Sequence, residues 1–323
     1  LRPAMRQLQL EADTRLREWV EKRFQDLPSL PVAKAPVMVH HIPRYLSMRR
    51  STGEDKIALV VFDGMALDQW VQIREYLSAR APDLTADENG CFAWLPSLTS
   101  VSRQALFSGL RPREFKASIE TTAQEPSLWN RFWLENGLRA GEVYYRKAIK
   151  RTEQLAELEA AVSSPSIKVA GLVVDMIDEL VHGAMLGKRG LSGQIQEWCE
   201  TGFVEELFKL LIGKGFHVYV TADHGNVDAE GIGRLNQGVI SEVRGERVRT
   251  YRSETLAESV PTGIDAFPFG GPGLPPDFLP LYASGRGAFV PAGHQVVAHG
   301  GMSVEELIVP FVKIGMKKEE NAD

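Results

Sequence analysis

The chain has 323 residues, of which 44% are hydrophobic and 24% charged, so it is long enough for two domains or one large α/β domain and too apolar for a disordered chain. Lys and Arg total 37 against 42 Asp and Glu, a net charge of -5 that argues against binding duplex DNA mainly by neutralising phosphates. Two cysteines supply neither a disulfide framework nor a Cys-rich metal site. The low cysteine content predicts a cytoplasmic protein, and since no run approaches the ~18 consecutive apolar residues of a membrane span, we expect no membrane association.

Residues 1–50 are predicted to form an N-terminal helix followed by an extended connector. Leu16, Val20 and Phe24 recur every four residues among charged side chains, which predicts an amphipathic helix over residues 10–24. Several prolines between residues 28 and 43 then predict an extended segment over 28–50.

Residues 51–323 are predicted to form the catalytic domain, of class α/β, with a mostly parallel central sheet and helices on both faces. Continuous apolar runs predict buried strands, and Pro310 in the last of them predicts an edge position or a bulge. The segment at about 231–291 lacks periodicity and is predicted to be an irregular insertion. The expected strands are 56–62, 169–174, 216–221 and 307–314, and the expected helices are 68–80, 101–108, 153–162 and 194–212.

Side chains that suit divalent metal ions lie next to these predicted strands. Each alone is also explained by a turn, a surface helix pair or a loop histidine, and Asp175 could replace Asp178 if its segment is not helical. Taken together at strand ends of one sheet, they predict two metal sites, the arrangement that clamps both oxygens of an in-line phosphoryl displacement. The expected ligands are Asp63, Asp223 and His224 for one ion, and Asp178, His182 and His299 for the other.

The segment 96–109 supplies hydroxyl groups at the start of a predicted helix, where the helix dipole favours an oxyanion. Thr99 and Ser100 are both candidate nucleophiles, and either could instead be an ordinary helix cap. Arg103 lies one turn beyond Thr99 and could donate to a phosphate oxygen or form a surface ion pair.

The motifs VVFDG, PSLTSVSRQALFSG, DELVH, TADHGN and HGG, in that order over residues 55–315, resemble the alkaline phosphatase superfamily and, within it, the PglZ domain. The resemblance implies an alkaline-phosphatase-like sandwich and favours Thr99, ten residues before Gly109, over Ser100 as the nucleophile. It also implies that Thr99 joins the ligands of the first metal and that Arg103 and Ser100 contact the substrate. Zinc is the ion usual in the superfamily, and the mixed ligand set would also accept manganese.

The same resemblance implies hydrolysis of phosphodiesters in preference to monoesters, including nucleotide or oligonucleotide substrates, through a phospho-threonine intermediate. It further implies partners among the proteins of bacterial phage-defence systems of the BREX type. Two alternatives stay open: a weakly active or inactive structural subunit of a defence complex, and a phosphomutase that transfers phosphate without net release.

Overall fold

The computed structural model describes residues 2–32, 34–183, 187–235, 245–253, 255 and 263–317. A six-stranded sheet in the order β2-β12-β5-β1-β4-β3 forms its centre. The pairs β1·β4, β1·β5 and β3·β4 are parallel, so the sheet is mostly parallel, as predicted. The strands are β1 (Ile57–Phe62), β2 (Leu84–Phe92), β3 (Val143–Ile149), β4 (Val169–Val174), β5 (His217–Ala222) and β12 (Ile308–Met316).

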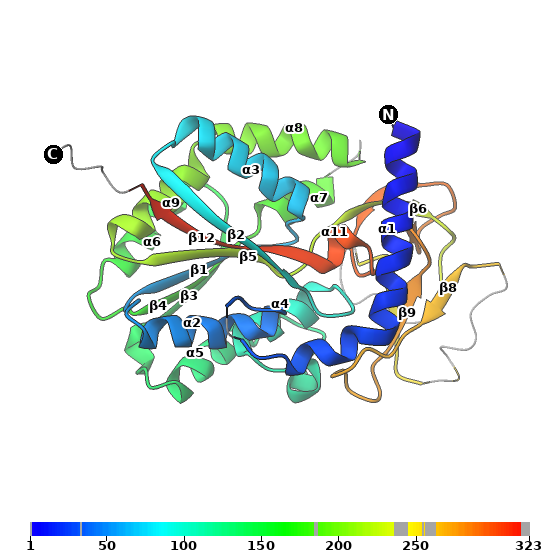
Figure 1. The fold of residues 1–323 in the computed structure, drawn as a ribbon, viewed down its shortest axis with the longest axis horizontal. Coiled ribbons are helices and arrows are strands. Elements are labelled where there is room, and N and C mark those ends of the chain that lie inside the picture. The colour runs from blue at the N-terminus through cyan, green and yellow to red at the C-terminus, as the bar shows by residue number, and fades with distance from the viewer. Residues whose placement is uncertain are drawn as a thin grey trace.

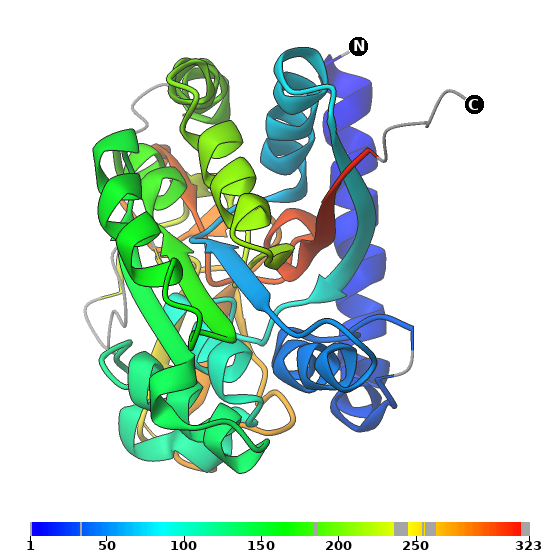
Figure 2. The same ribbon diagram turned by 90° about the vertical axis from the view of Figure 1, so that its left-hand side faces the viewer.

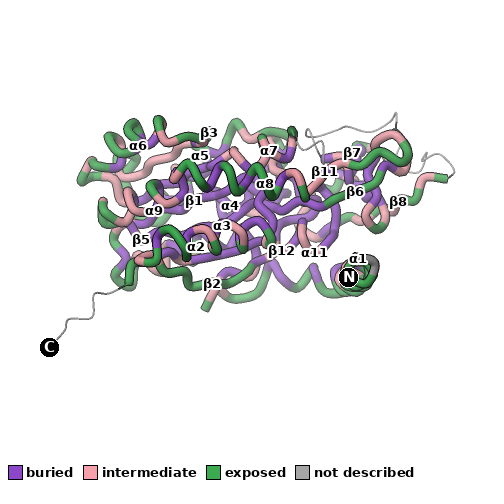
Figure 3. Tube along the Cα trace, turned by 90° about the horizontal axis from the view of Figure 1, so that it is seen from above, coloured by how far each residue is buried: buried purple, intermediate pink, exposed green. Residues whose placement is uncertain are grey.

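The central strands are covered on both faces by helices. Figure 1 shows α3, α8 and α9 on one face and α2, α4 and α5 on the other, and Figure 2 shows the two helical layers from the end of the sheet. Every residue of β1 and β4 is buried, which explains their unbroken apolar sequences (Figure 3). The helices around the sheet are α2 (Ile42–Ser51), α3 (Leu67–Arg80), α4 (Thr99–Ser108), α5 (Glu125–Glu135), α6 (Leu155–Val162), α7 (Met176–Gly183), α8 (Gly187–Glu200) and α9 (Phe203–Gly213).

The helix predicted over 194–212 is two helices, α8 and α9, because the chain turns at Gly202, whose φ of 82° is left-handed. In the part of the chain that the structure describes, no helix has the length and apolar character needed to cross a bilayer.

The predicted edge position of Pro310 is wrong. β12 lies between β2 and β5 and runs antiparallel to both. Pro310 has no N–H to donate, and the pairing with β5 begins only at Phe311, opposite Thr221. The Thr221 hydroxyl donates to the Pro310 carbonyl at 2.8 Å, which retains a link between the strands at this point.

The prediction of an extended connector over 28–50 is wrong for residues 28–29, which end a 3-10 helix, and for residues 39–50, which form a 3-10 turn, η2 (Val39–His41), and most of the helix α2. Pro43 lies in the first turn of α2, where a missing N–H costs no helical hydrogen bond. The predicted N-terminal helix is confirmed and is longer than expected: α1 spans Arg2–Arg23 and is followed by η1 (Phe24–Ser29).

The segment predicted as irregular contains short strands in its described parts. They belong to two three-stranded sheets, ordered β10-β6-β11 and β7-β9-β8, which lie beside α1 in Figure 1. These strands are β6 (Val227–Gly231), β7 (Val248–Tyr251), β8 (Ala266–Pro268), β9 (Leu279–Ala283), β10 (Gly287–Ala288) and β11 (Gln295–Ala298). The short helices still to be named are η3 (Pro112–Ser118), η4 (Ala140–Glu142), η5 (Thr152–Gln154) and α11 (Val304–Leu307).

Candidate active site

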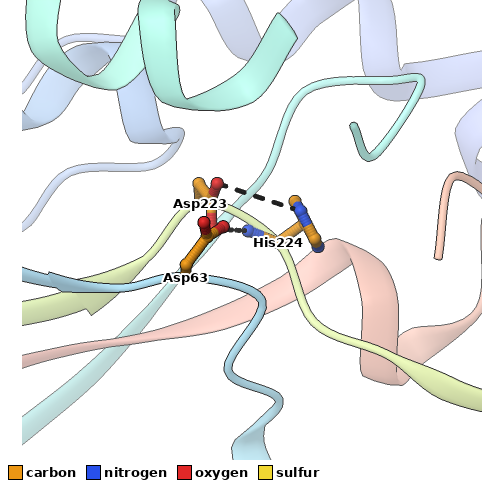
Figure 4. Close-up of side chains that lie close together, drawn as sticks. All are labelled: Asp63, Asp223 and His224. Carbon is orange, nitrogen blue, oxygen red and sulfur yellow. Dashed lines mark hydrogen bonds and ion pairs between the residues drawn. The ribbon is translucent and has the colours of Figure 1, made fainter. Parts of the chain in front are cut away.

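Three of the predicted metal ligands meet at the carboxyl ends of β1 and β5. Asp63 follows β1, and Asp223 and His224 follow β5, so adjacent parallel strands carry them to one edge of the sheet. One donor atom from each residue lies within 4.8 Å of the other two, and all three side chains are buried (Figure 4). Two carboxylates and an imidazole at such separations are a ligand set that a divalent ion can use.

The carboxylates of this cluster have polar atoms that the protein leaves unsatisfied. Asp223 Oδ1 accepts the backbone N–H groups of Gly64 at 3.0 Å and His224 at 3.1 Å. Asp223 Oδ2 and Asp63 Oδ1 are buried, and neither accepts a hydrogen bond from the described residues. Burial, and then the charge of Asp63, raise the pKa of Asp223 well above its usual range. Because buried anionic oxygens without partners are costly, these residues fit a bound divalent cation.

Thr99 lies against this cluster. Its Oγ1 is 2.9 Å from Nε2 of His224, while Nδ1 of the same ring is 3.0 Å from the Gly225 carbonyl. Since a carbonyl only accepts, Nδ1 carries the proton, and Nε2 has a lone pair for the Thr99 hydroxyl or for a metal ion. Gly225 has no room for a side chain, because an added Cβ would lie 1.8 Å from the Glu305 carbonyl oxygen.

His299 also reaches this edge. Its ring stacks on His224 with centroids 4.1 Å apart and an interplanar angle of 17°, and its Nδ1 is 3.0 Å from the Ser97 carbonyl. The Ser97 hydroxyl donates to Gly301 and accepts from the N–H of Gly300, which fastens this loop to the segment before α4.

Asp178 and His182 lie one turn apart on α7, with Asp178 Oδ2 3.0 Å from His182 Nε2. A Cβ placed on Gly64 would be 3.5 Å from His224 Cε1 and 3.9 Å from Asp178 Oδ1, so Asp178 lies beside the first cluster. Burial is the largest single influence on the pKa of Asp178 and raises it, but the His182 hydrogen bond and the charges of the neighbouring histidines together lower this pKa below its usual value. Within the described ranges, Asp178, His182 and His299 do not close into a second triad like the first.

Arg103 is buried rather than on the surface, so the alternative of a surface ion pair is wrong. Its Nη1 donates to Asp63 Oδ2, and its Nε donates to Glu125 Oε1 at 2.8 Å. A contact between Arg103 and the substrate stays a prediction, as does the role of Ser100, which is buried in the first turn of α4.

Asp175 lies between β4 and α7, next to Asp63 across the parallel pairing of Phe62 with Val174. α7 is helical from Met176, so the condition under which Asp175 would replace Asp178 as a ligand is not met. Burial, and then the charge of Asp63, raise the pKa of Asp175 to about 6.

Residues 44–314 match the protein family described as the BREX system PglZ alkaline phosphatase-like domain. The chain belongs to this family. It is therefore a phosphoric ester hydrolase of the alkaline phosphatase-like type, a superfamily that uses divalent metals. No curated protein matches the chain.

The fold of the PglZ domain is similar to that of ectonucleotide pyrophosphatase/phosphodiesterase 5. The murine protein, solved alone and as an inactive threonine-to-alanine variant in complex with AMP, gives a TM-score of 0.56 at 12% identity. The match to the AMP complex covers 80% of this chain and 88% of that one. The human protein gives a TM-score of 0.50 at 12% identity over 80% of this chain and 87% of its own.

Sequence reasoning missed the residues that hold the PglZ site together. Asn226, the last residue of the TADHGN motif, donates from Nδ2 to the Gly64 carbonyl at 2.7 Å and exchanges amide hydrogen bonds with Gln69. Its place two residues after the predicted ligand His224 was a signal that could have identified it. Glu306, fully buried, accepts from the N–H of Gly301 at 2.7 Å and from Arg247 Nε at 2.8 Å. Nothing in the sequence links Arg247 to Glu306, because Arg247 comes just before β7 and Glu306 lies in α11, far along the chain.

Proposed function

We propose that this PglZ domain is a metal-dependent phosphohydrolase that uses Thr99 as its nucleophile and acts on phosphodiesters in preference to monoesters. The observation that carries the proposal is the 2.9 Å separation of Thr99 Oγ1 and His224 Nε2 beside two buried carboxylates. A hydroxyl held at a ligand cluster of this kind is placed for attack on a phosphorus atom bound there.

Thr99 is the first residue of α4, a ten-residue helix whose axis points its positive end at the site. In the proposed reaction the bond from Thr99 Oγ1 to phosphorus forms while the bond from phosphorus to the leaving oxygen breaks. The proton that Thr99 gives up passes to solvent, and the leaving oxygen takes up one proton and departs as an alcohol. Water then attacks the phosphorus of the phospho-threonine, the bond from phosphorus to Oγ1 breaks, and Oγ1 takes up a proton from that water, which restores Thr99 and releases the phosphate product. The helix dipole stabilises the negative charge on the phosphoryl oxygens during both steps.

Asp63, Asp223 and His224, with Thr99, would hold one ion, and Asp178, His182 and His299 would hold the second. When bound, a divalent ion lowers the pKa of the attacking hydroxyl and neutralises charge on the leaving oxygen. We propose zinc, because imidazole and carboxylate together suit it, and manganese as an ion that the same set would accept.

Two observations support phosphodiesters as the substrates, with nucleotides or oligonucleotides among them. Arg103 already pairs with Asp63 and Glu125, which leaves less positive charge for the second negative charge of a monoester. The fold is similar to that of ectonucleotide pyrophosphatase/phosphodiesterase 5, which has been solved in complex with AMP. Since the family description names the BREX system, we further propose that the domain works in the bacterial cytoplasm with other proteins of such a defence system.

The test is hydrolysis of an aryl phosphodiester with zinc or manganese by the wild type and by Thr99→Ala, Thr99→Ser and the exposed control Ser166→Ala. Thr99→Ala is expected to lose at least about 100-fold in kcat, Thr99→Ser to retain part of it, and Ser166→Ala to match the wild type. Wild-type turnover by Thr99→Ala would refute the mechanism.

The two alternatives have their own readouts. Full phage protection by a hydrolytically dead Thr99→Ala variant would favour the structural subunit. Phosphate transfer between sugar phosphates without net release would favour the phosphomutase.

A further inference from the structure

Asp63, a proposed metal ligand, is the first of three buried charged residues that form consecutive ion pairs leading away from the site. Arg103 is only 4% exposed and lies between two carboxylates, those of Asp63 and Glu125. Glu125 is 0% exposed and comes from α5, a different helix from the one that carries Arg103. A carboxylate this deep is rare in proteins unless it is paired, and the partner of Glu125 is Arg103.

Both oxygens of Glu125 are occupied. Oε1 accepts Arg103 Nε at 2.8 Å, and Oε2 accepts the hydroxyl of Tyr145, on β3, at 2.6 Å. These bonds fix the plane of Glu125 and therefore the direction of the Arg103 guanidinium. With Nε held by Glu125, Nη1 is the atom that reaches Asp63 Oδ2. The orientation of Asp63 thus depends on α5 and β3 as well as on its own strand.

Charge balance gives this arrangement a consequence for metal binding. Asp63, Arg103 and Glu125 together carry a net charge of minus one, which would attract a divalent ion bound beside Asp63. Without the charge of Glu125 the three groups would be neutral, and Arg103 would have Asp63 as its only anionic partner among these contacts. The guanidinium would then compete with the ion for the Asp63 carboxylate, at short range and in a buried environment where such charges are poorly screened.

We infer that Glu125 is a positioning residue which, through Arg103, holds Asp63 ready for a divalent ion and sets the affinity of that site. The inference rests on the proposed metal site and adds a residue that touches neither substrate nor ion. Burial raises the pKa of Glu125, and the Arg103 charge and the Tyr145 hydrogen bond oppose that rise. Both of its oxygens accept hydrogen bonds, one from Arg103 Nε and one from the Tyr145 hydroxyl, as the oxygens of an ionised carboxylate do.

The chain contains a closely matched control at the other end of β1. Glu54 is 5% exposed, accepts Arg49 Nε at 2.9 Å and accepts the Tyr219 hydroxyl at 2.7 Å. It therefore has the same kinds of partner as Glu125, an arginine and a tyrosine, and differs in having Lys313 as a further donor and in lying away from the ligand cluster.

The experiment is calorimetric titration of metal-stripped full-length protein with zinc, for the wild type, Glu125→Gln, Glu54→Gln and Asp223→Asn. Glu125→Gln is expected to weaken zinc binding by about 10- to 100-fold, as loss of a group that orients a metal ligand does. Glu54→Gln is expected to lower Tm and leave the zinc affinity unchanged. An affinity for Glu125→Gln within about twofold of the wild type, with binding lost in Asp223→Asn, would overturn the inference and leave the metal site intact.

Absence of zinc binding by the wild type would overturn the metal site itself and the inference with it. Where Glu125→Gln does not fold, Tyr145→Phe replaces it, because this change removes only the hydroxyl that orients Glu125. Weaker zinc binding by Tyr145→Phe supports the inference, and unchanged binding overturns it.

Discussion

His224 and His299 stack face to face, with ring centroids 4.1 Å apart, although one follows β5 and the other precedes β12. A loop that precedes a parallel strand would lie at the opposite edge of the sheet. His299 reaches the site because β12 runs antiparallel to β5, so the chain enters β12 at the edge where β5 ends. The antiparallel direction of β12 therefore places His299, a predicted ligand of the second ion, next to the predicted ligands of the first ion.

Asp223→Asn is expected to raise the stability of the metal-free protein and to abolish its stabilisation by zinc. Its Oδ2 is buried and accepts no hydrogen bond from the residues that the structure describes, and burial raises its pKa, so Asp223→Asn is expected to stabilise the metal-free protein at neutral pH by about 1–3 kcal/mol. The same change removes a proposed metal ligand, and added zinc is expected to raise Tm in the wild type only. Thermal unfolding with and without a chelator measures both effects, with the exposed Asp68→Asn as control. A metal-free Asp223→Asn protein less stable than the wild type would contradict the explanation.

Asp175 predicts a pH dependence of stability in the metal-free protein. Its pKa is raised from 3.8 to about 6, so between these values the folded state binds more protons than the unfolded state. The free energy of unfolding therefore falls as pH rises through this window and stays reduced above it. Asp175→Asn is expected to be more stable than the wild type at pH 7 by about 1–2 kcal/mol and similar to it at pH 4. Denaturant unfolding across this range checks this, and equal pH profiles would refute it.

The Arg247–Glu306 pair is expected to stabilise the loop that carries His299. Arg247 is 1% exposed, donates to Glu306 and bonds the carbonyls of Gly285 and Gly287. Arg247→Met would leave the buried Glu306 carboxylate without its cationic partner and is expected to lower the free energy of unfolding by about 3–5 kcal/mol. Urea unfolding measures this loss of stability and compares it with that of Arg252→Met. The second variant breaks an exposed ion pair with Glu120 and is expected to lower the free energy of unfolding by less than about 1 kcal/mol. Similar losses of unfolding free energy in the two variants would show that burial does not determine how much an ion pair stabilises this protein.

Asp13 connects α1 to the same loop. Its carboxylate accepts the N–H of Val304, the first residue of α11, at 3.0 Å and pairs with Arg286 at 2.9 Å. Asp13→Ala is expected to destabilise the protein by about 1–2 kcal/mol, as loss of a helix cap does. It is also expected to speed hydrogen exchange over residues 299–307 while the exposed control Glu11→Ala does not. Exchange unchanged in that segment would mean that α1 packs there without stabilising it.

The sequence predicts the buried strands well because burial on two faces requires continuous apolar runs, as in β1, β4 and β5. It does not reveal β2, whose residues Thr85–Gly90 are exposed at the edge of the sheet and polar in character. The helix α2 is hidden by Pro43, since a proline in a first turn has the same appearance in sequence as one that breaks a helix.

Of the site, the sequence identifies residues that stand at strand ends, such as Asp63 and Asp223, because the sheet itself places them. It does not identify Glu125, which begins α5 and has no motif around it. Its partner Arg103 lies on another helix, so only the tertiary packing of α4 against α5 shows the pair.

A zinc-edge anomalous difference map from crystals of the wild type and of Asp223→Asn, both grown with zinc, tests whether the cluster binds a metal ion beside Thr99. The account predicts a peak in the wild type bonded to Asp63, Asp223 and His224 next to the Thr99 hydroxyl, and no peak there in the variant. A wild-type map without density at this position, with zinc present in the crystal, would contradict it.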